Sequence, residues 1–274
     1  MQTLTKLRAA QVVLAQRVQN KGRSLEFTDE QLERYSRHII LRDVGGVGQA
    51  QLLAAKVLVV GAGGLGAPVL QYLAAAGVGT IGVVDNDVVD LSNLKRQIIH
   101  TTEGVGLAKA DSVASAIKAL NPDVQVELYK VRLDADNAQD IIGGYDIIAD
   151  GTDNFKTRHI ISDTCVKLKK TLVSAALGPF EGQLATFKPH AGAGLPCYRC
   201  FLPEEPPEDM QRTCSDIGIL GAVAGVVGTM QALEVIKEIL AIGDSLAGKL
   251  VMIDALSMST RTIGLPQDPN CVAC

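Results

Sequence analysis

The residues most able to do chemistry begin with a glycine-rich loop. Gly61-Ala-Gly63-Gly64-Leu-Gly66 follows a strand-like run, Lys56–Val60, and precedes an apolar run with helical spacing. Backbone amides of such a loop, together with the N-terminus of the helix behind it, bind phosphate. Asp85 ends the next strand-like run, where a carboxylate can accept hydrogen bonds from both ribose hydroxyls. This order of elements predicts a nucleotide site, with NAD as the default nucleotide.

The residues beyond Asp85 favour a different use of the nucleotide. Arg96, Lys109 and Asp153 supply two cations and a carboxylate, which a site that cleaves a triphosphate needs for the phosphates and Mg²⁺. Each could also be an ordinary solvated side chain, but all three fall near predicted strand ends or helix starts, which favours one shared site. An NAD-dependent oxidoreductase is the alternative from another class, and a non-catalytic, zinc-containing binding module is a third.

The cysteines suggest a metal site and a reactive thiol. Cys197/Cys200 and Cys271/Cys274 are two Cys-x-x-Cys pairs, which together can close a tetrahedral structural zinc site, whereas one pair alone would fit a redox dithiol. Cys214 precedes a predicted apolar helix, Ser215–Leu240, whose N-terminus would lower the pKa of the thiol. The sequence does not decide between a functional role for Cys214 and a buried, purely structural one.

Alternating strands and helices must position these residues. The pattern predicts an α/β, Rossmann-like, doubly wound and mainly parallel sheet with an antiparallel C-terminal extension. Thr28 and Gln31 have capping-box spacing and predict a helix that carries Tyr35 to His38. We expect an N-terminal helical extension at residues 1–25 and one domain over 26–274. The expected strands are Lys56–Val60, Gly79–Asp85, Val124–Leu128, Asp146–Asp150, Leu172–Ala176, Gly182–Lys188 and a pair within Lys249–Ile263.

Composition excludes several classes of function. The 26 Lys and Arg residues against 30 Asp and Glu give a net charge of −4, with no Trp, so nucleic-acid binding is not expected. Val57–Val84 carries no charge, but its glycines and its change of period fit a buried strand–helix–strand unit better than a membrane span. With no signal peptide in the sequence, we expect a cytoplasmic protein without a membrane partner.

The ordered motifs resemble the ThiF/MoeB/HesA family, bacterial relatives of the ubiquitin-activating enzymes. The resemblance runs from Thr28 to Cys274 and rests on the Gly-x-Gly-Gly-x-Gly loop, Asp85-x-Asp87, Ser92-Asn-Leu-x-Arg96-Gln97, Thr152-Asp-Asn154 and the paired cysteines. It implies ATP-dependent adenylation of the C-terminal Gly-Gly carboxylate of a ubiquitin-fold sulfur-carrier protein. The products would be an acyl-adenylate and pyrophosphate, and a separate sulfur donor would then give the thiocarboxylate.

The resemblance also assigns residues. Asp153 would face Mg²⁺ and act with Arg96 and Lys109; Arg37 would be delivered by the partner subunit of a homodimer, and Cys214 matches a cysteine that some relatives use covalently. Thr213-Cys214, Gly218 and Gly248–Asp254 favour the molybdopterin branch (a MoaD-like carrier) over the thiamine branch (a ThiS-like carrier). The implied nucleotide site comprises Gly61, Gly63, Gly64, Gly66, Asp85, Asp87, Ser92, Asn93, Leu94, Lys95, Arg96, Lys109, Asp153 and Asn154.

Overall fold

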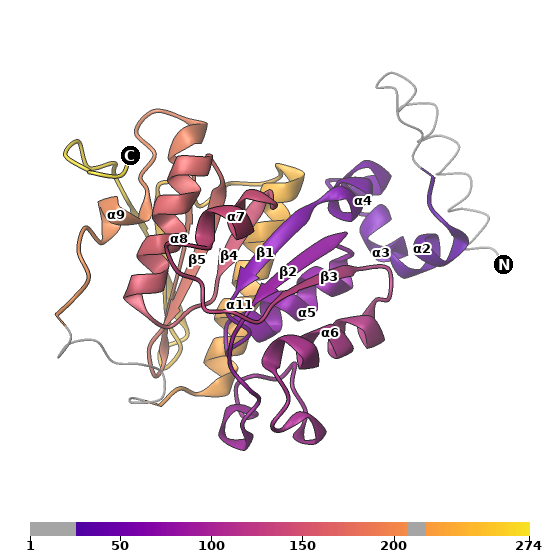
Figure 1. Cartoon of the computed structure of the whole chain (residues 1–274). Coiled ribbons are helices and arrows are strands. Elements are labelled where there is room, and N and C mark those ends of the chain that lie inside the picture. The colour runs from indigo at the N-terminus through magenta and orange to yellow at the C-terminus, as the bar shows by residue number, and fades with distance from the viewer. Residues whose placement is uncertain (1–25, 208–217) are drawn as a thin grey trace.

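An eight-stranded sheet forms the centre of the protein. The computed structural model describes residues 26–207 and 218–274, so the expected extension at 1–25 and Cys214 lie outside the described residues. The strand order is β3-β2-β1-β4-β5-β6-β7-β8 (Figure 1). The bounds are β1 Lys56–Val60, β2 Thr80–Val84, β3 Gln125–Tyr129, β4 Ile147–Asp150, β5 Thr171–Leu177, β6 Glu181–Phe187, β7 Lys249–Asp254 and β8 Ser259–Gly264.

The first five strands are parallel, and β6 to β8 pair antiparallel to their neighbours. The structure therefore confirms the predicted mainly parallel sheet with an antiparallel C-terminal extension. The described helices are α2 Asp29–Arg34, α3 Ser36–Ile39, α4 Gly45–Ala54, α5 Gly66–Ala76, α6 Lys109–Leu120, α7 Ala138–Gly143, α8 Phe155–Leu168, α9 Tyr198–Phe201 and α11 Gly221–Leu240.

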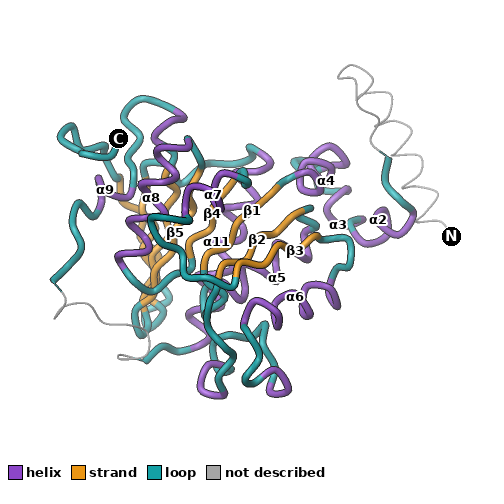
Figure 2. Tube along the Cα trace, viewed as in Figure 1, coloured by secondary structure: helices purple, strands orange, loops and turns teal. Residues whose placement is uncertain are grey.

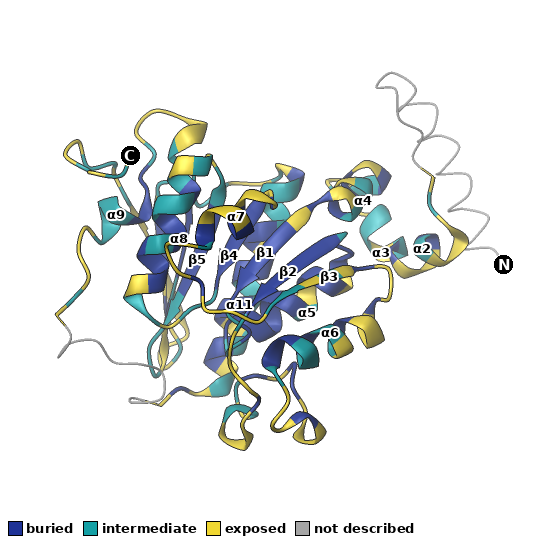
Figure 3. Ribbon diagram, viewed as in Figure 1, coloured by how far each residue is buried: buried dark blue, intermediate teal, exposed yellow. Residues whose placement is uncertain are grey.

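Helices cover both faces of the sheet and enclose two apolar cores. Helices α4, α5, α6 and α11 supply side chains to the core on one face, and α7, α8 and α9 supply those on the other. Strands β2 and β4 are buried from end to end, and β1 between them is exposed only at Lys56 (Figure 3). The uncharged stretch Val57–Val84 becomes β1, α5 and β2, as predicted. Within the described part of the chain, no helix combines the length and apolarity needed to cross a bilayer.

Two predicted helices are corrected. The capping box at Thr28 and Gln31 forms, but α2 ends at Arg34, and Tyr35 separates it from α3. The apolar helix begins at Gly221 rather than Ser215, because Gly218 adopts a left-handed φ of +72° and Leu220 is extended. Cys214 therefore does not directly precede α11, and the helix-end argument for its reactivity does not apply to that helix.

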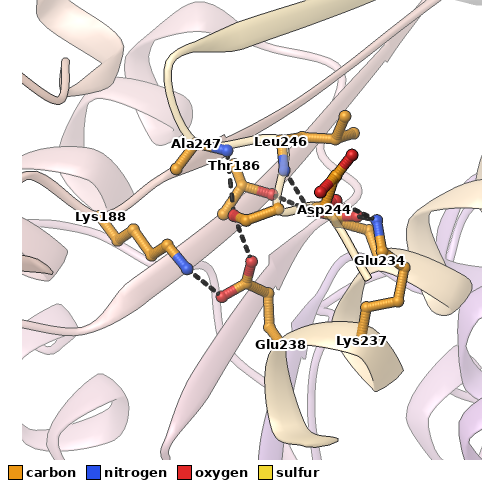
Figure 4. A network of polar contacts seen from close by, with 9 residues as sticks. Thr186, Lys188, Glu234, Lys237, Glu238, Asp244, Leu246 and Ala247 are labelled. Carbon is orange, nitrogen blue, oxygen red and sulfur yellow. Dashed lines mark hydrogen bonds and ion pairs between the residues drawn. The ribbon is translucent and has the colours of Figure 1, made fainter. Parts of the chain in front are cut away.

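A buried polar network fixes α11 against the antiparallel strands (Figure 4). Glu234, 2% exposed, accepts hydrogen bonds from the Thr186 hydroxyl at 2.9 Å and the Leu246 amide at 2.8 Å. One turn later, Glu238 pairs with Lys188 at 2.6 Å. Buried carboxylates are tolerated only with such partners. The network thus joins α11 to β6 and to the segment before β7.

Candidate active site

A cavity of about 430 Å³ opens where the parallel strands end. The loops that follow β1, β2 and β4 gather at this edge (Figure 2), as expected for a ligand site in a doubly wound sheet. Most of the predicted nucleotide residues line it: Gly61, Gly63, Gly64, Asp85, Asp87, Asn93, Arg96, Lys109, Asp153 and Asn154.

Other predicted residues lie outside the lining. Ser92, Leu94 and Lys95 do not reach this cavity. Gly66 begins α5 and serves close packing, since a Cβ there would lie 1.8 Å from the Gly61 carbonyl oxygen. Arg37 is exposed on α3, which lies beside α4 near the start of β1, away from the strand ends that border the cavity (Figure 1).

The glycine-rich loop is anchored by Asp85. Its Oδ2 accepts a hydrogen bond from the Ala62 amide at 2.7 Å, and its Oδ1 accepts one from the Asp87 amide at 2.8 Å. Each carboxylate oxygen retains a second lone pair, which a ribose hydroxyl can use. Asp85 therefore holds the glycine-rich loop in place, in addition to the ribose role predicted for it.

His100 anchors the same loop from the other side. It is 5% exposed, its Nε2 lies 3.1 Å from the Ala62 carbonyl oxygen, and its Nδ1 lies 2.9 Å from Ser112 Oγ on α6. A carbonyl only accepts, so Nε2 carries the proton. The Ala62 carbonyl and the Gly63 amide belong to one trans peptide group, in which C=O and N–H point in opposite directions. Fixing the carbonyl therefore also fixes the direction of the Gly63 N–H. Burial, together with the nearby Lys109 charge, lowers the pKa of His100.

We expect His100→Asn to weaken ATP binding and His100→Gln to preserve it. Glutamine can place its amide nitrogen near Nε2 and still donate to Ala62, whereas asparagine reaches only toward Ser112. Loss of one buried hydrogen bond predicts a roughly tenfold higher Kd for ATP in the asparagine variant. Calorimetric titration with ATP, alongside melting temperatures for both variants, checks this. Equal ATP affinities in the two variants would contradict a positioning role.

Arg96 and Lys109 are the two predicted cations in the lining of the cavity. Lys109 is 5% exposed, and its Nζ lies 2.9 Å from Asp87 Oδ2. Arg96 is half-buried and, among the described residues, contacts no carboxylate; its Nη1 faces the Ser92 carbonyl at 3.5 Å. A partly buried cation without a counterion attracts phosphate more strongly than a solvated one. Arg96 and Lys109 together suit the charge of a triphosphate.

The loop after β4 supplies the free acid. Asp150 is buried, and its carboxylate accepts hydrogen bonds from Thr152 and Ser174. Asn154 caps α8 by accepting from the Thr157 amide at 2.9 Å. Asp153, between them, is exposed, and no ion pair or hydrogen bond from the described residues occupies its carboxylate. The flanking residues thus fix a loop that presents one unpaired carboxylate to the cavity, as Mg²⁺ coordination requires.

Sequence reasoning missed part of the lining. Val131, Arg132 and Leu133 follow β3, and Ile219 precedes α11, but none belongs to a recognisable motif. Arg158 on α8 was also missed, although it follows the Thr-Asp-Asn motif by only one helical turn. Residues four positions apart lie on the same face of a helix, so the distance from Asn154 to Arg158 is the one sequence signal that indicates this residue.

The four paired cysteines converge away from the cavity, beside α9. All four sulfur atoms lie within 4.8 Å of one another, with separations of 3.9 Å for Cys197–Cys200, 3.6 Å for Cys197–Cys271 and 3.4 Å for Cys200–Cys274. A tetrahedral zinc site with Zn–S bonds of 2.3 Å has sulfur–sulfur edges of about 3.8 Å. The cluster therefore fits Zn²⁺, which would join the C-terminal residues to α9.

Replacing one of these ligands should remove the metal and lower stability. We expect Cys271→Ser to reduce bound zinc from one per chain to near zero and to lower the melting temperature, because metal binding contributes directly to folding. Cys165→Ala, a buried cysteine on α8 outside the cluster, is the control and should keep its zinc. Zinc analysis by atomic absorption, with calorimetry before and after chelation, measures both. Full zinc retention in Cys271→Ser would exclude the four-ligand site.

Comparison with known proteins identifies the family of this chain. The model of the ThiF family matches residues 35–273. The chain belongs to the ThiF family. It is 47% identical to the sulfur carrier protein adenylyltransferase of Thermus thermophilus, over 91% of this chain and 93% of that protein. It is 45% identical to the SAMP-activating enzyme E1 of Haloferax volcanii, over 92% of each.

One longer relative and one solved structure are also similar to this chain. The probable adenylyltransferase/sulfurtransferase MoeZ of Mycobacterium tuberculosis is 49% identical over 88% of this chain, which spans 62% of MoeZ. The crystal structure of E. coli MccB with MccA-N7isoASN superposes with a TM-score of 0.77 at 22% identity, covering 91% of this chain and 76% of that one. At that identity the likeness shows the fold alone, and it supports the Rossmann-like architecture of this ThiF-family chain.

Proposed function

We propose that this protein uses ATP to adenylate the C-terminal Gly-Gly carboxylate of a ubiquitin-fold sulfur-carrier protein. The observation that carries this is the cavity itself, which an anchored glycine loop, Arg96, Lys109 and the exposed Asp153 line together. The names of the T. thermophilus and H. volcanii relatives support the same reaction class. We further propose that residues 26–274 act as one adenylation unit, and that a separate protein donates the sulfur.

In the proposed reaction the carboxylate oxygen attacks the α-phosphorus of ATP, and pyrophosphate leaves. The nucleophile already carries its charge, so the protein need not remove a proton, and catalysis is positioning plus charge neutralisation. Arg96, Lys109 and the loop amides would hold the phosphates, and Asp85 the ribose. Asp153 would hold Mg²⁺, which supplies further positive charge at the phosphates.

The route for the carrier's tail is a second cavity. It measures about 410 Å³, lies over β5 and β6, and shares Phe155, Arg158, Ala176 and Leu177 with the nucleotide cavity. An extended glycine tail can pass through such a space to the phosphates. Pro206, which lines it, follows the exposed Glu204 and Glu205, so an acidic segment borders this cavity, and it would contact the carrier there.

The choice of carrier is the finer part of the proposal. Gly218 and Gly248–Asp254 support the molybdopterin branch, with a thiamine-branch carrier as the alternative; Thr213 and Cys214 lie outside the described residues. ATP–pyrophosphate exchange, measured with a MoaD-like and a ThiS-like carrier separately, tests both the adenylation reaction and the choice of carrier. Exchange with one carrier alone assigns the branch, and exchange with neither contradicts the proposed adenylation of these carriers.

A further inference from the structure

The two cavities meet at a single charged side chain. Of the four residues that line both, Phe155, Ala176 and Leu177 are apolar, and Arg158 is the only cation. Arg158 belongs to the first turn of α8, which starts directly after the loop that carries Asp153. A substrate that spans both cavities has to pass this guanidinium.

Arg158 is buried without a counterion. It is 8% exposed, yet no carboxylate of the described residues lies within ion-pairing distance of it. Its hydrogen bonds go to the Thr152 carbonyl and the Tyr198 hydroxyl, both neutral. Asp150, the buried acid at the end of β4, has both carboxylate oxygens engaged by Thr152 and Ser174.

A buried cation is costly unless an anion accompanies it. A guanidinium has five donors in a planar fork, so two neutral acceptors leave part of the fork for a ligand. The geometry of that fork matches a carboxylate, which it can bind through two parallel hydrogen bonds. The position and charge of Arg158 therefore define an anion subsite at the junction.

We propose that Arg158 binds the carboxylate that is to be activated and orients it toward the α-phosphate. This rests on the proposed adenylation. The new bond joins the carboxylate oxygen to the α-phosphorus, the bond between the α-phosphorus and the bridging oxygen breaks, and pyrophosphate leaves with that electron pair. Arg158 keeps its proton throughout. The phosphates have Arg96 and Lys109, whereas Arg158 alone among these cations also lines the second cavity.

The test compares two forms of one carrier. A MoaD-like sulfur carrier that ends in Gly-Gly is prepared with its free C-terminal carboxylate and, by semisynthesis, with a C-terminal carboxamide. Calorimetry measures the binding of each form to the full-length protein with a non-hydrolysable ATP analogue and Mg²⁺ present. The variants are Arg158→Gln, Arg158→Lys and, as a matched control, Arg34→Gln, whose arginine pairs with Glu30 at the surface of α2.

We expect the unmodified protein and Arg34→Gln to prefer the carboxylate by on the order of tenfold or more, as for a hydrogen-bonded charge. Arg158→Gln should lose this preference, and Arg158→Lys should keep part of it, while all three variants bind the ATP analogue as the unmodified protein does. Melting temperatures identify any variant that fails to fold, in which case Arg158→Lys decides.

Two results would overturn the assignment. An unchanged preference in Arg158→Gln excludes carboxylate binding by this residue. A matching loss of affinity for the ATP analogue shows that Arg158 serves the phosphates or only supports the Thr152 loop. If the unmodified protein binds neither form of a MoaD-like or a ThiS-like carrier, the proposed function fails together with this inference, and that outcome is distinct from the other two.

Discussion

Replacing Asp153 by alanine should abolish adenylation while leaving the fold intact. Its carboxylate is exposed and, among the described residues, unpaired, so its removal breaks no hydrogen bond or ion pair that the structure describes. The same carboxylate lines the cavity, and it is the Mg²⁺ ligand that we propose. Losing a metal ligand and its charge compensation should lower the exchange rate at least about 100-fold.

The measurement is ATP–pyrophosphate exchange with the productive carrier, over a range of Mg²⁺ concentrations. Asp140→Ala, an exposed acid on α7 away from the cavity, is the matched control and should retain full exchange. Melting temperature and zinc content should equal those of the unmodified protein in both variants. Undiminished turnover in Asp153→Ala would remove Asp153 from the site and, with it, the proposed role of the β4 loop.

The parts of this site that sequence predicted are those encoded locally. The glycine loop and Asp85 follow directly on apolar runs whose period identifies a strand, and Lys109 begins a segment with helical period. The sheet edge then brings them together, because the parallel strands of this fold all end there. The sequence also predicted that the two Cys-x-x-Cys motifs form one site, because zinc requires ligands at this spacing.

The missed parts depend on contacts between distant segments. His100 lies just after the Ser92–Gln97 motif but is not part of it, and its partners, Ala62 and Ser112, lie 38 and 12 positions away. Arginine is a residue type usually found at the surface, and the burial of Arg158 depends on the packing of α8 against the rest of the fold. The early start predicted for α11 failed for a related reason, because apolar composition does not reveal that Gly218 adopts a left-handed backbone conformation.

Mixed dimers should recover activity if Arg37 acts across a subunit interface. In this chain Arg37 is exposed on α3 and does not line the cavity, yet the family resemblance assigns it to the reaction. Arg37→Ala alone should then lower exchange as severely as Asp153→Ala, on the order of 100-fold. A dimer of one Arg37→Ala chain and one Asp153→Ala chain has one site intact at both positions and one site lacking both.

For two-fold symmetric dimers mixed at random, half are heterodimers with one working site, so about a quarter of the original activity should return. Coexpression with two affinity tags isolates the heterodimer, which should reach about half. The matched control pairs Asp153→Ala with Lys109→Ala: both residues line the cavity of the same chain, so every site keeps one defect and no activity returns. Recovery in neither mixture would place Arg37 outside the site of the partner. Recovery in both would mean that Asp153 and Lys109 serve different sites, which their shared cavity contradicts.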